Sequence, residues 1–372
     1  MADTAPTLTN GTPDDVGLST DQLERASGLL GAARDAGEIG AASLTVARYG
    51  KLIFSAGHGE QRPGEGQAVD ADSIFLLASI TKPVTACALM ILVDRGLVSL
   101  DDPAVDYLPE FTGGERPQVL VRHLLSHISG MPDMLPENVG LRRDHQPQAV
   151  FIERALRTPL LYAPATDFRY QSKGILLAAA IVERVSGMRL RDFERQEIFA
   201  PLGMERSALG LGDFAIEDTV WCGLKTPAEE DGELRSWGWN SPYWRDFGAP
   251  WGGMHSTGRD LAVLLQTMLN GGAYGHKRIF SRAAVAAMTC NQNEDLDAPW
   301  GLGWGIYRSK VWSYWGRLAS PGVFGHTGAT GTVAWGDGER GLSCVVLCNQ
   351  MVRNGSLLRR VSNAVSAAVV EV

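Results

Sequence analysis

A nearly continuous apolar stretch constrains the fold of this chain more than any other feature. From Val84 to Val93 almost every residue is apolar, and a run with so little polar face predicts a buried helix. Proline is tolerated only in the first turn of a helix, so Pro83 places the start of this helix near Ser79. We therefore expect a buried helix that opens near Ser79 and ends at Gly96.

Ser79 and Lys82 lie one turn apart and share a face at the start of this helix. The free N–H groups and the dipole of a helix N-terminus favour negative charge there, and the ammonium of Lys82 lies within reach. A serine nucleophile uses each part of such an arrangement. A Ser-x-x-Lys match also arises readily by chance, and a serine in this place is often only a helix cap. The motif alone therefore leaves both interpretations open.

Composition limits the class of protein. The chain has 372 residues, more than one typical domain, and its 45% hydrophobic share supports a large core. A net charge of -8 without a basic run argues against nucleic acid as a partner. No apolar run is long enough to span a membrane. We expect a protein that binds neither nucleic acid nor membranes, and the sequence leaves its oligomeric state open.

The N-terminus and the cysteines favour a cytoplasmic location. Residues 1–6 have neither the basic nor the apolar region of a signal peptide. The five cysteines have no disulfide-framework spacing and are interpreted as free thiols of a reducing compartment; they are Cys87, Cys222, Cys290, Cys344 and Cys348.

Two β-hairpins are predicted in distant parts of the chain. Strand-like residues flank Tyr49-Gly50 and, much later, Asp337-Gly338, and such turn residues are typical of hairpins. The strands concerned are residues 41–48 with 51–56, and residues 331–336 with 342–348. Because helices bracket both hairpins, the economical architecture places both in one antiparallel sheet with the terminal helices on its face.

Helices account for most of the remainder. Ser19 and Gln22 form a capping-box signature that opens a helix ending near Gly37. Further helices are predicted at residues 121–127, 148–156 and 173–185, within 252–270, and at 356–370. Long strand patterns are missing from about residue 100 to 245.

These patterns predict an α+β protein of the broad α/β class, with an antiparallel sheet flanked by helices and a second, mostly helical lobe. The sheet domain is expected to comprise residues 15–100 and 246–372, and the helical domain residues 101–245. Residues 1–14 are interpreted as a loose N-terminal arm. The active site should lie between the two domains.

Five large aromatic residues crowd the end of the helical segment: Trp237, Trp239, Tyr243, Trp244 and Trp251. Core packing explains any one of them. Five such residues within a short stretch that also contains glycines favour the wall of an apolar pocket.

Two further stretches place reactive side chains beside structural elements. Tyr170 precedes an apolar helix, and His326 lies in a glycine-rich segment that precedes a strand. Glycine allows the backbone to approach a ligand closely. Taken singly, a tyrosine there is usually packing and a lone histidine is usually structural.

Together these stretches resemble a known family. The chain is similar to the serine hydrolases that include class C β-lactamases, D-alanyl-D-alanine peptidases and family VIII carboxylesterases, through Ser79-x-x-Lys82, Tyr170-x-Ser172 and His326-Thr327-Gly328. Further matches are Leu100 to Pro103, Tyr107 to Pro109, His123 to Pro132, Gly252 to Thr257 and Asp260-Leu261. The resemblance covers nearly the whole chain and implies a fold like that of β-lactamases and penicillin-binding proteins.

The resemblance also implies roles. Ser79 would attack a carbonyl group and form an acyl-enzyme, with Lys82 and Tyr170 together as the base. A free lysine titrates near ~10.4 and a free tyrosine near ~10, but side by side and partly desolvated each lowers the other's cost of losing a proton. Which of the two holds the proton stays open. The oxyanion hole would use the N–H groups of Ser79 and Ala329.

Substrate binding is implied for Ser172, His326, Thr327 and Gly328, and the aromatic cluster adds Trp237, Trp239 and Trp244. No metal and no cofactor is implied, since the chain has no His-Glu-x-x-His motif.

The chain departs from the family pattern in two places. The second motif commonly ends in Asn but here ends in Ser172, and the third has His326 where β-lactamases usually carry Lys. Both departures weaken a β-lactamase interpretation. A cytoplasmic location also disfavours cell-wall substrates, and the aromatic cluster favours an apolar acyl or alcohol group.

We therefore predict a serine hydrolase that works through an acyl-enzyme, a carboxylesterase acting on small-molecule esters with short to medium acyl groups. The alternatives within the fold are a D-amino-acid peptidase or amidase, an acyltransferase and a β-lactamase. A non-catalytic relative would be expected to lose Ser79, Lys82 or Tyr170, and all three are present. An α/β-hydrolase is excluded because no serine lies in a Gly-x-Ser-x-Gly motif.

Overall fold

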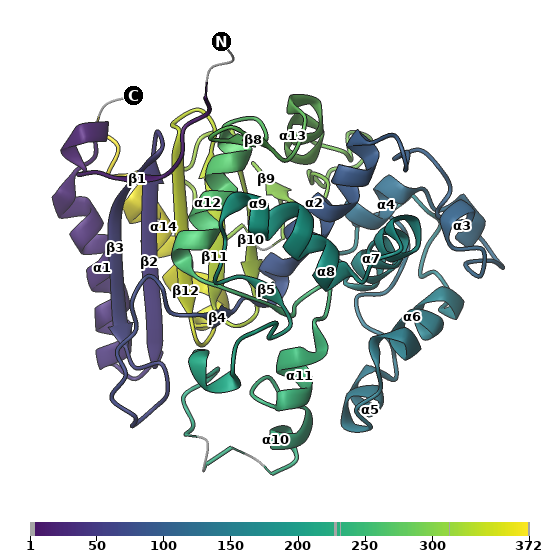
Figure 1. Cartoon of the computed structure of the whole chain (residues 1–372), viewed down its shortest axis with the longest axis horizontal. Helices are drawn as coiled ribbons and strands as arrows, with labels where there is room; N and C mark the ends of the chain where they lie inside the picture. The colour runs from purple at the N-terminus through teal and green to yellow at the C-terminus, as the bar shows by residue number, and fades with distance from the viewer. Residues whose placement is uncertain (1–3, 227–228, 231, 312, 371–372) are drawn as a thin grey trace.

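A seven-stranded sheet forms the centre of the protein (Figure 1). The computed structural model describes residues 4–226, 229–230, 232–311 and 313–370. The order of the strands is β1-β3-β2-β12-β11-β10-β9. Their bounds are β1 (Thr9–Asn10), β2 (Ala41–Arg48), β3 (Lys51–Gly59), β9 (Gly305–Ile306), β10 (Val323–Gly328), β11 (Thr332–Asp337) and β12 (Leu342–Cys348). Neighbouring strands are antiparallel except for the edge pair of β1 and β3.

Both predicted hairpins are present and they meet in one sheet. The β2–β3 hairpin turns at Tyr49-Gly50, and β12 pairs along β2 with Leu342 opposite Arg48. Every residue of β2 and β12 is buried, because both faces of the sheet are covered. This confirms the predicted antiparallel sheet shared by the two ends of the chain.

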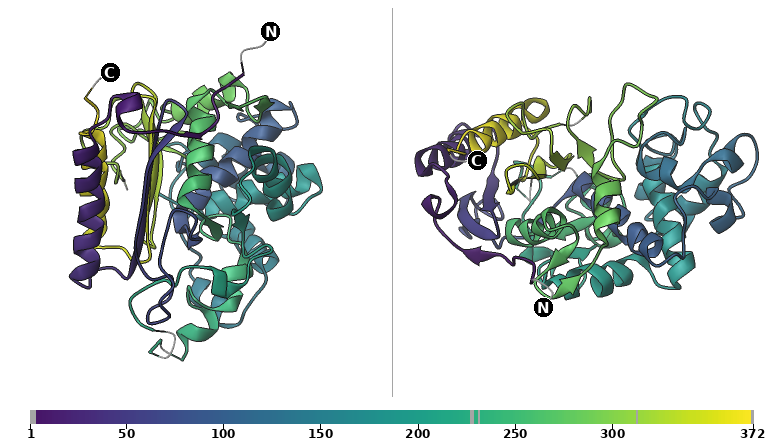
Figure 2. Two further views of the ribbon diagram at one scale, coloured as in Figure 1. Left: turned by 60° about the vertical axis from the view of Figure 1, so that its left-hand side comes forward. Right: turned by 90° about the horizontal axis from the view of Figure 1, so that it is seen from above.

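Helices cover both faces of the sheet (Figure 2). On one face, α1 (Thr20–Asp35) packs beside α14 (Ser356–Ser366), and on the other lies α12 (Gly258–Leu269). Ser19 caps α1 by accepting a hydrogen bond from the Gln22 N–H, as its sequence predicts. The sheet is therefore the middle layer of a helix–sheet–helix arrangement.

Helices are the main regular elements between residues 101 and 245, joined by long irregular segments. These helices are α3 (Ala104–Tyr107), α4 (Val121–Leu125), α5 (Asn138–Arg143), α6 (Gln148–Arg157), α7 (Lys173–Ser186), α8 (Leu190–Glu194), α9 (Ala200–Leu202), α10 (Leu234–Trp237) and α11 (Pro242–Phe247). The buried helix predicted from the apolar stretch is α2 (Thr81–Asp94), which packs against α7 and α8. The exact boundaries of two separate domains stay a prediction.

Short strands and one further helix complete the chain. A three-stranded sheet has the order β4-β6-β5, and β7 pairs with β8. These elements are β4 (Phe75–Leu76), β5 (Ala208–Leu209), β6 (Met254–Ser256), β7 (Ala273–Tyr274), β8 (Lys277–Arg278) and α13 (Arg282–Thr289). The small sheet joins the segment before Ser79 to the end of the helical part.

Two predictions about the ends of the chain need correction. The arm is not loose, since β1 pairs in parallel with β3 and Ala5 bridges Gly275; residues 1–3 of the arm lie outside the described residues. The last helix ends at Ser366 rather than Val370, because Val369 forms a bridge with Leu18. Both differences come from pairing between distant segments.

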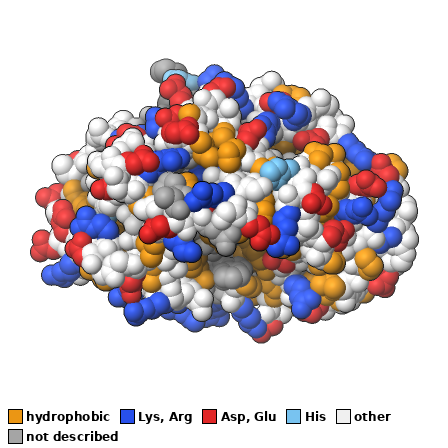
Figure 3. All heavy atoms as spheres, turned by 90° about the horizontal axis from the view of Figure 1, so that it is seen from below, with side chains coloured by type: hydrophobic (Ala, Val, Ile, Leu, Met, Phe, Trp, Pro, Cys, Tyr) orange, Lys and Arg blue, Asp and Glu red, His pale blue; other side chains and the backbone are white. Residues whose placement is uncertain are grey.

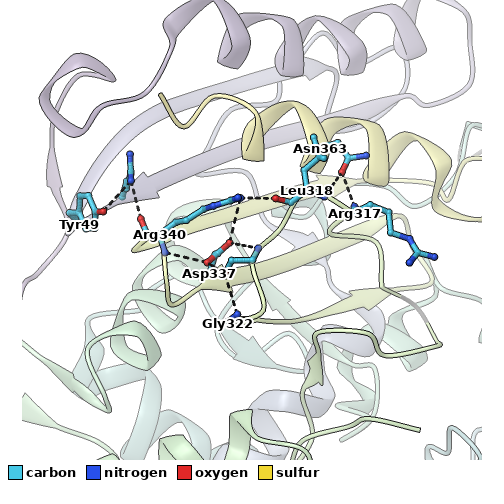
Figure 4. A network of polar contacts seen from close by, with 9 residues as sticks. Tyr49, Arg317, Leu318, Gly322, Asp337, Arg340 and Asn363 are labelled. Atoms are coloured by element: carbon cyan, nitrogen blue, oxygen red, sulfur yellow. Dashed lines mark hydrogen bonds and ion pairs between the residues drawn. The ribbon is translucent and has the colours of Figure 1, made fainter. Parts of the chain in front are cut away.

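A polar network fastens α14 to the sheet (Figure 4). The side-chain oxygen of Asn363, on α14, accepts hydrogen bonds from the N–H groups of Arg317 (2.8 Å) and Leu318 (3.2 Å). The guanidinium of Arg340, in the β11–β12 turn, donates to the Leu318 carbonyl at 2.7 Å. Asp337 at the end of β11 accepts from the Arg340 N–H at 3.2 Å. The loop between β9 and β10 is thus tied to both the turn and the helix.

The surface carries interspersed charges of both signs and is hollowed near the middle of the face seen from below (Figure 3). Exposed ion pairs such as Arg184–Glu110, with 2.7 Å between nitrogen and oxygen, contribute little to stability individually. In the described part of the chain, no helix is both long and apolar enough to cross a bilayer.

Candidate active site

Ser79 lies in a tight turn directly before α2. Residues Ala78–Ile80 form a 3-10 turn that leads into α2 at Thr81. Ala78 has a φ of 50°, a left-handed backbone conformation that residues other than glycine rarely adopt. The Thr81 hydroxyl donates to the Ala78 carbonyl at 2.7 Å and holds the turn closed. Ser79 itself is only partly buried, so its hydroxyl is presented at the start of the helix as the sequence predicts.

Lys82 lies next to Ser79 on the same face of the helix. Its Nζ donates to the Ser79 Oγ at 2.8 Å and to the Trp251 carbonyl at 3.0 Å. The side chain is almost completely buried, and burial lowers the pKa of Lys82 to about 7. The Asp133 carboxylate opposes this pKa shift and the Lys173 ammonium adds to it. Lys82 can therefore exist as a free amine beside the Ser79 hydroxyl near neutral pH.

Tyr170 completes this group. Its ring centre lies 4.8 Å from the Lys82 Nζ, and its hydroxyl lies 3.5 Å from His326 Nε2. Burial holds the pKa of Tyr170 well above its usual range, while a hydrogen bond with the Ser79 side chain opposes that shift. The expectation that both members of the pair lose their protons more easily is thus wrong for Tyr170. The phenol keeps its proton, and Lys82 is the better base of the two.

The third motif reaches Ser79 from the end of β10. Gly328 lies so close to the segment before Ser79 that a Cβ on it would be 2.0 Å from the Leu77 carbonyl oxygen. The hydroxyls of Thr330 and Thr332 donate to the Leu76 and Leu77 carbonyls, each at 2.8 Å. These contacts place the chain that continues to Ala329 beside the turn that carries Ser79. The oxyanion hole formed by Ser79 and Ala329 stays a prediction.

His326 is a neutral imidazole within this site. It is 2% exposed, and burial together with the nearby Lys82 ammonium lowers the pKa of His326 to about 3. Its Nδ1 accepts a hydrogen bond from the Thr327 N–H at 2.9 Å. Thr327 is buried as well. At neutral pH, the third motif therefore supplies hydrogen-bonding groups and no positive charge.

In the second motif, the Ser172 side chain is already hydrogen-bonded to another residue of the protein. The Ser172 hydroxyl donates to Asp133 Oδ1 at 2.7 Å, and the Ser172 N–H donates to the Asp133 carbonyl at 3.2 Å. Asp133 is exposed, whereas Ser172 is buried. The sequence motifs did not identify Asp133, although it directly follows the Gly130-Met-Pro132 stretch of the family resemblance.

Lys173 is a second buried lysine next to the site. Its Nζ lies 3.8 Å from the ring centre of Trp251, and in the described part of the chain it has no hydrogen-bond partner. Burial lowers the pKa of Lys173 to about 7, although Asp133 and Glu137 oppose the shift. Lys173 was not among the predicted site residues, although a lysine that opens an apolar helix directly after Ser172 is a visible signal in the sequence.

His127 packs behind Tyr170. The ring centres of His127 and Tyr170 lie 4.6 Å apart, and the Trp300 ring centre lies 4.9 Å from His127 and 6.0 Å from Tyr170. Burial, Lys82 and His326 all hold the pKa of His127 well below its usual range. His127 has a φ of 64° and its Nδ1 accepts from the Gln171 N–H at 3.3 Å. Its contacts fix the Tyr170 ring, so we assign it a structural role.

Several members of the aromatic cluster contact one another or neighbouring side chains. Trp244 is 5% exposed, stacks on Phe247 with 5.5 Å between ring centres, and lies beneath the Arg142 guanidinium at 3.8 Å. Trp237 lies 5.1 Å from the same guanidinium, whereas Trp239 is 38% exposed. These contacts explain Trp244 as packing. The substrate-binding role of the three tryptophans stays a prediction.

Within the described ranges, no three or more His, Cys, Asp or Glu side chains are grouped so that they could hold a metal ion. At Ser79 a hydroxyl, an amine and a phenol contact one another. A serine that contacts a lysine with a lowered pKa, beside a protonated tyrosine, is the arrangement of a serine hydrolase that transfers acyl groups.

Comparison with known proteins gives the family. The model of the family described as Beta-lactamase matches residues 27–368, and the chain belongs to this family. A protein of Salmonella agona (strain SL483) is 28% identical over 93% of this chain and 86% of its own length, and its name proposes a D-alanyl-D-alanine carboxypeptidase.

Two solved structures share the fold. A penicillin-binding protein homologue from Caulobacter crescentus has a TM-score of 0.77 at 23% identity, covering 95% of this chain and 99% of that one. A family VIII carboxylesterase has a TM-score of 0.73 at 21% identity, covering 93% of this chain and 98% of that one. The chain therefore has the fold of penicillin-binding proteins and β-lactamases, and it is a serine hydrolase of the Beta-lactamase family.

Proposed function

We propose that this serine hydrolase is a carboxylesterase that acts on small esters through an acyl-enzyme at Ser79. The observation that carries the proposal is the state of the second and third motifs. The Ser172 hydroxyl already donates a hydrogen bond to Asp133 at 2.7 Å, and His326 is neutral. A peptide or β-lactam needs groups that hold its amide and its carboxylate. An ester depends less on such groups, because an alkoxide departs more easily than an amine.

The first half of the reaction forms the acyl-enzyme. The Ser79 Oγ attacks the carbonyl carbon of the ester while its proton passes to the Lys82 Nζ, 2.8 Å away. The carbonyl oxygen becomes an oxyanion that faces the N–H groups of Ser79 and Ala329. When the intermediate collapses, the bond to the alcohol oxygen breaks and that oxygen takes up a proton. Tyr170, which is protonated and hydrogen-bonded to Ser79, gives its proton to this oxygen and takes up the proton that Lys82 received.

The second half releases the acid. Water attacks the acyl carbon and gives a proton to Lys82, which is again a free amine. The new tetrahedral intermediate expels the Ser79 oxygen, which is reprotonated by Lys82 or through Tyr170. The carboxylic acid leaves and the enzyme returns to its starting state.

One panel of substrates tests this proposal. The panel comprises p-nitrophenyl acetate, butyrate and octanoate, nitrocefin and a D-alanine amide. We expect kcat/KM for the butyrate ester to exceed that for nitrocefin by about a hundredfold, a difference of roughly 2.7 kcal/mol in transition-state energy. Ser79→Ala should fold normally and lose nearly all activity, and a serine-directed phosphonate should label the parent at Ser79. Comparable efficiency on nitrocefin, or labelling of another serine, would contradict the proposal.

Ser172→Asn sharpens the same test. An asparagine amide offers both a donor and an acceptor where the serine hydroxyl is held by Asp133. The substitution should narrow the gap between the ester and nitrocefin. A gap that stays unchanged would show that the second motif does not determine the choice of substrate.

A D-amino-acid peptidase is the second candidate. The similarity of the Salmonella agona protein over most of both chains favours it. The neutral His326 disfavours it for substrates with a free terminal carboxylate, because no cation in the third motif would hold that group. The D-alanine amide in the panel decides between the two.

We also propose that the enzyme works in the cytoplasm on a small-molecule ester and binds neither nucleic acid nor membranes. The five cysteines, of which four are buried, are all free thiols, as expected of a reducing compartment. Separation of the cell compartments followed by immunodetection would test the location.

A further inference from the structure

The described part of the active site holds a carboxylate that has no cation as a partner. Asp133 is exposed and its Oδ1 accepts the Ser172 hydroxyl at 2.7 Å. Asp133 also acts electrostatically on Lys82 and Tyr170, so this carboxylate lies close to the reacting groups. Among the ion pairs of the described residues, none involves Asp133.

The charge of Asp133 acts on the catalytic residues directly. It opposes the lowering of the pKa of both Lys82 and Lys173, and it contributes to the raised pKa of Tyr170. All three groups therefore lie within electrostatic range of one carboxylate. A substrate bound at Ser79 occupies the same field.

The positive groups around the site do not cancel this charge in the alkaline range. Lys82 and Lys173 both have a pKa of about 7, and His326 has a pKa of about 3. Above neutral pH these groups are mainly uncharged, so they no longer oppose the electrostatic effect of Asp133 and Glu137 on this site. The field at the site is then negative, and it favours a positively charged substrate over a neutral one of the same shape.

We propose that Asp133 determines specificity and that the enzyme prefers esters that carry a permanent positive charge, such as quaternary ammonium esters. This inference rests on the proposed esterase function and adds the substrate class. The same carboxylate repels substrates with a free carboxylate, so cationic esters should be cleaved best, neutral ones less well and anionic ones least.

Two pairs of substrates of equal shape test the proposal at pH 8.5 and low salt. The first pair is the p-nitrophenyl ester of γ-trimethylammoniobutyric acid and the neutral ester in which carbon replaces the nitrogen. The second pair is butyrylcholine and its neutral carbon analogue. The first pair places the charge on the acyl side and the second on the alcohol side. Because the charge is permanent, the protonation of the substrate does not complicate the comparison.

We expect kcat/KM to favour the cationic member of at least one pair by about fivefold, as for a partly exposed pair of charges. Asp133→Asn should bring this ratio close to one, and Asp133→Glu should keep most of it. Asp144→Asn, which removes an exposed carboxylate that has no contact with the three motifs, is the matched control and should leave the ratio unchanged. Salt at 0.5 M should reduce the ratio in the parent enzyme.

The outcomes separate the two proposals. Ratios near one in both pairs, or a cationic preference that survives Asp133→Asn, would overturn this inference while leaving the esterase intact. Failure of the parent enzyme to hydrolyse any of the four esters would overturn both. A ratio that falls with Asp133→Asn and persists in Asp133→Glu supports the carboxylate as the group that recognises the substrate.

Discussion

Two lysines open two neighbouring helices in this protein, and only one of them is placed for chemistry. Lys82 lies in the first turn of α2 and Lys173 is the first residue of α7, which packs against α2. Burial lowers the pKa of each to about 7. Lys82 Nζ contacts the Ser79 hydroxyl and the Trp251 carbonyl, whereas Lys173 Nζ faces the Trp251 ring.

The difference teaches that a lowered pKa does not by itself identify a catalytic base. Burial has the same electrostatic consequence for both lysines. A base must also lie within hydrogen-bonding distance of the proton that it removes, and in the described structure only Lys82 meets that condition for Ser79. Burial of the Lys173 amine destabilises the folded protein, and this amine acts on the reaction only through its charge.

Activity gives the largest expected contrast between them. Lys82→Ala should lower kcat by about 10³-fold because it removes the base, whereas Lys173→Met should lower it less than about tenfold. Hydrolysis of p-nitrophenyl butyrate, with folding checked by circular dichroism, measures both. Equal losses in the two variants would contradict the distinction.

Double variants sharpen this contrast. Lys82→Ala combined with Tyr170→Phe should be little worse than either alone, because groups that act as one unit are not additive. Lys82→Ala combined with Lys173→Met should be no worse than Lys82→Ala alone, because Lys173 acts on the reaction only through its charge near Lys82. Fully multiplicative losses in the first pair would show that Lys82 and Tyr170 do not share a proton.

The next largest expected effect is on stability. Lys173→Met removes a buried amine that has no hydrogen-bond partner in the described structure. The pKa of Lys173 falls from 10.5 to about 7 on folding, so the folded state binds the proton less well than the unfolded state. The penalty is full below pH 7, shrinks as the pH rises and is absent above 10.5. Lys173→Met should raise the free energy of unfolding by about 2 kcal/mol at pH 6.5 and by much less at pH 9.5.

Urea unfolding at the two pH values measures this effect. Lys277→Met, which changes an exposed lysine of β8, is the control and should be nearly neutral at both. A Lys173→Met protein that is destabilised at pH 6.5 would show that the contact with the Trp251 ring outweighs the cost of burying the amine.

A buried acid should show the opposite dependence of stability on pH. Burial raises the pKa of Glu194, at the end of α8, from 4.5 to about 8, and its Oε1 accepts from the Thr85 hydroxyl at 3.4 Å. The penalty for the charge is absent below pH 4.5, grows as the pH rises and is complete above pH 8. Glu194→Gln should therefore stabilise the protein by about 1 kcal/mol at pH 8.5 and hardly at all at pH 5. A gain that falls with rising pH would contradict this sign.

The smallest effect is on the pH profile. The kcat/KM of the parent should rise as Lys82 loses its proton near pH 7. Lys173→Met removes a positive neighbour, so the pKa of Lys82 should increase and this rise should move to higher pH by about half a unit. Asp133→Asn should move it in the opposite direction. A profile unmoved by either substitution would show that neither charge reaches Lys82.

Features determined by nearby residues could be predicted from the sequence. The hairpin at Tyr49-Gly50, the cap at Ser19 and the start of α2 near Ser79 each depend on a few adjacent residues, and each is present. The family motifs indicated Ser79, Lys82 and Tyr170, which the structure brings into contact.

Features determined by distant residues could not. The pairing of β1 with β3 and the early end of α14 depend on segments far apart in the chain. The opposite pKa shifts of Lys82 and Tyr170 depend on burial, which is a property of the whole fold. The sequence does not show which tryptophan rings of the cluster pack against Phe247 and Arg142 and which would face a ligand.

The position of β12 in the sheet has a consequence for synthesis on the ribosome. β12 lies between β2 and β11, with Leu342 paired to Arg48. The N-terminal hairpin emerges first and waits with one open edge while about 300 further residues are translated. An open strand edge invites pairing with other chains, and contacts so distant in sequence form slowly. A chaperone that covers the β2 edge until β12 has been made should therefore improve the yield of folded enzyme more than any change at the active site.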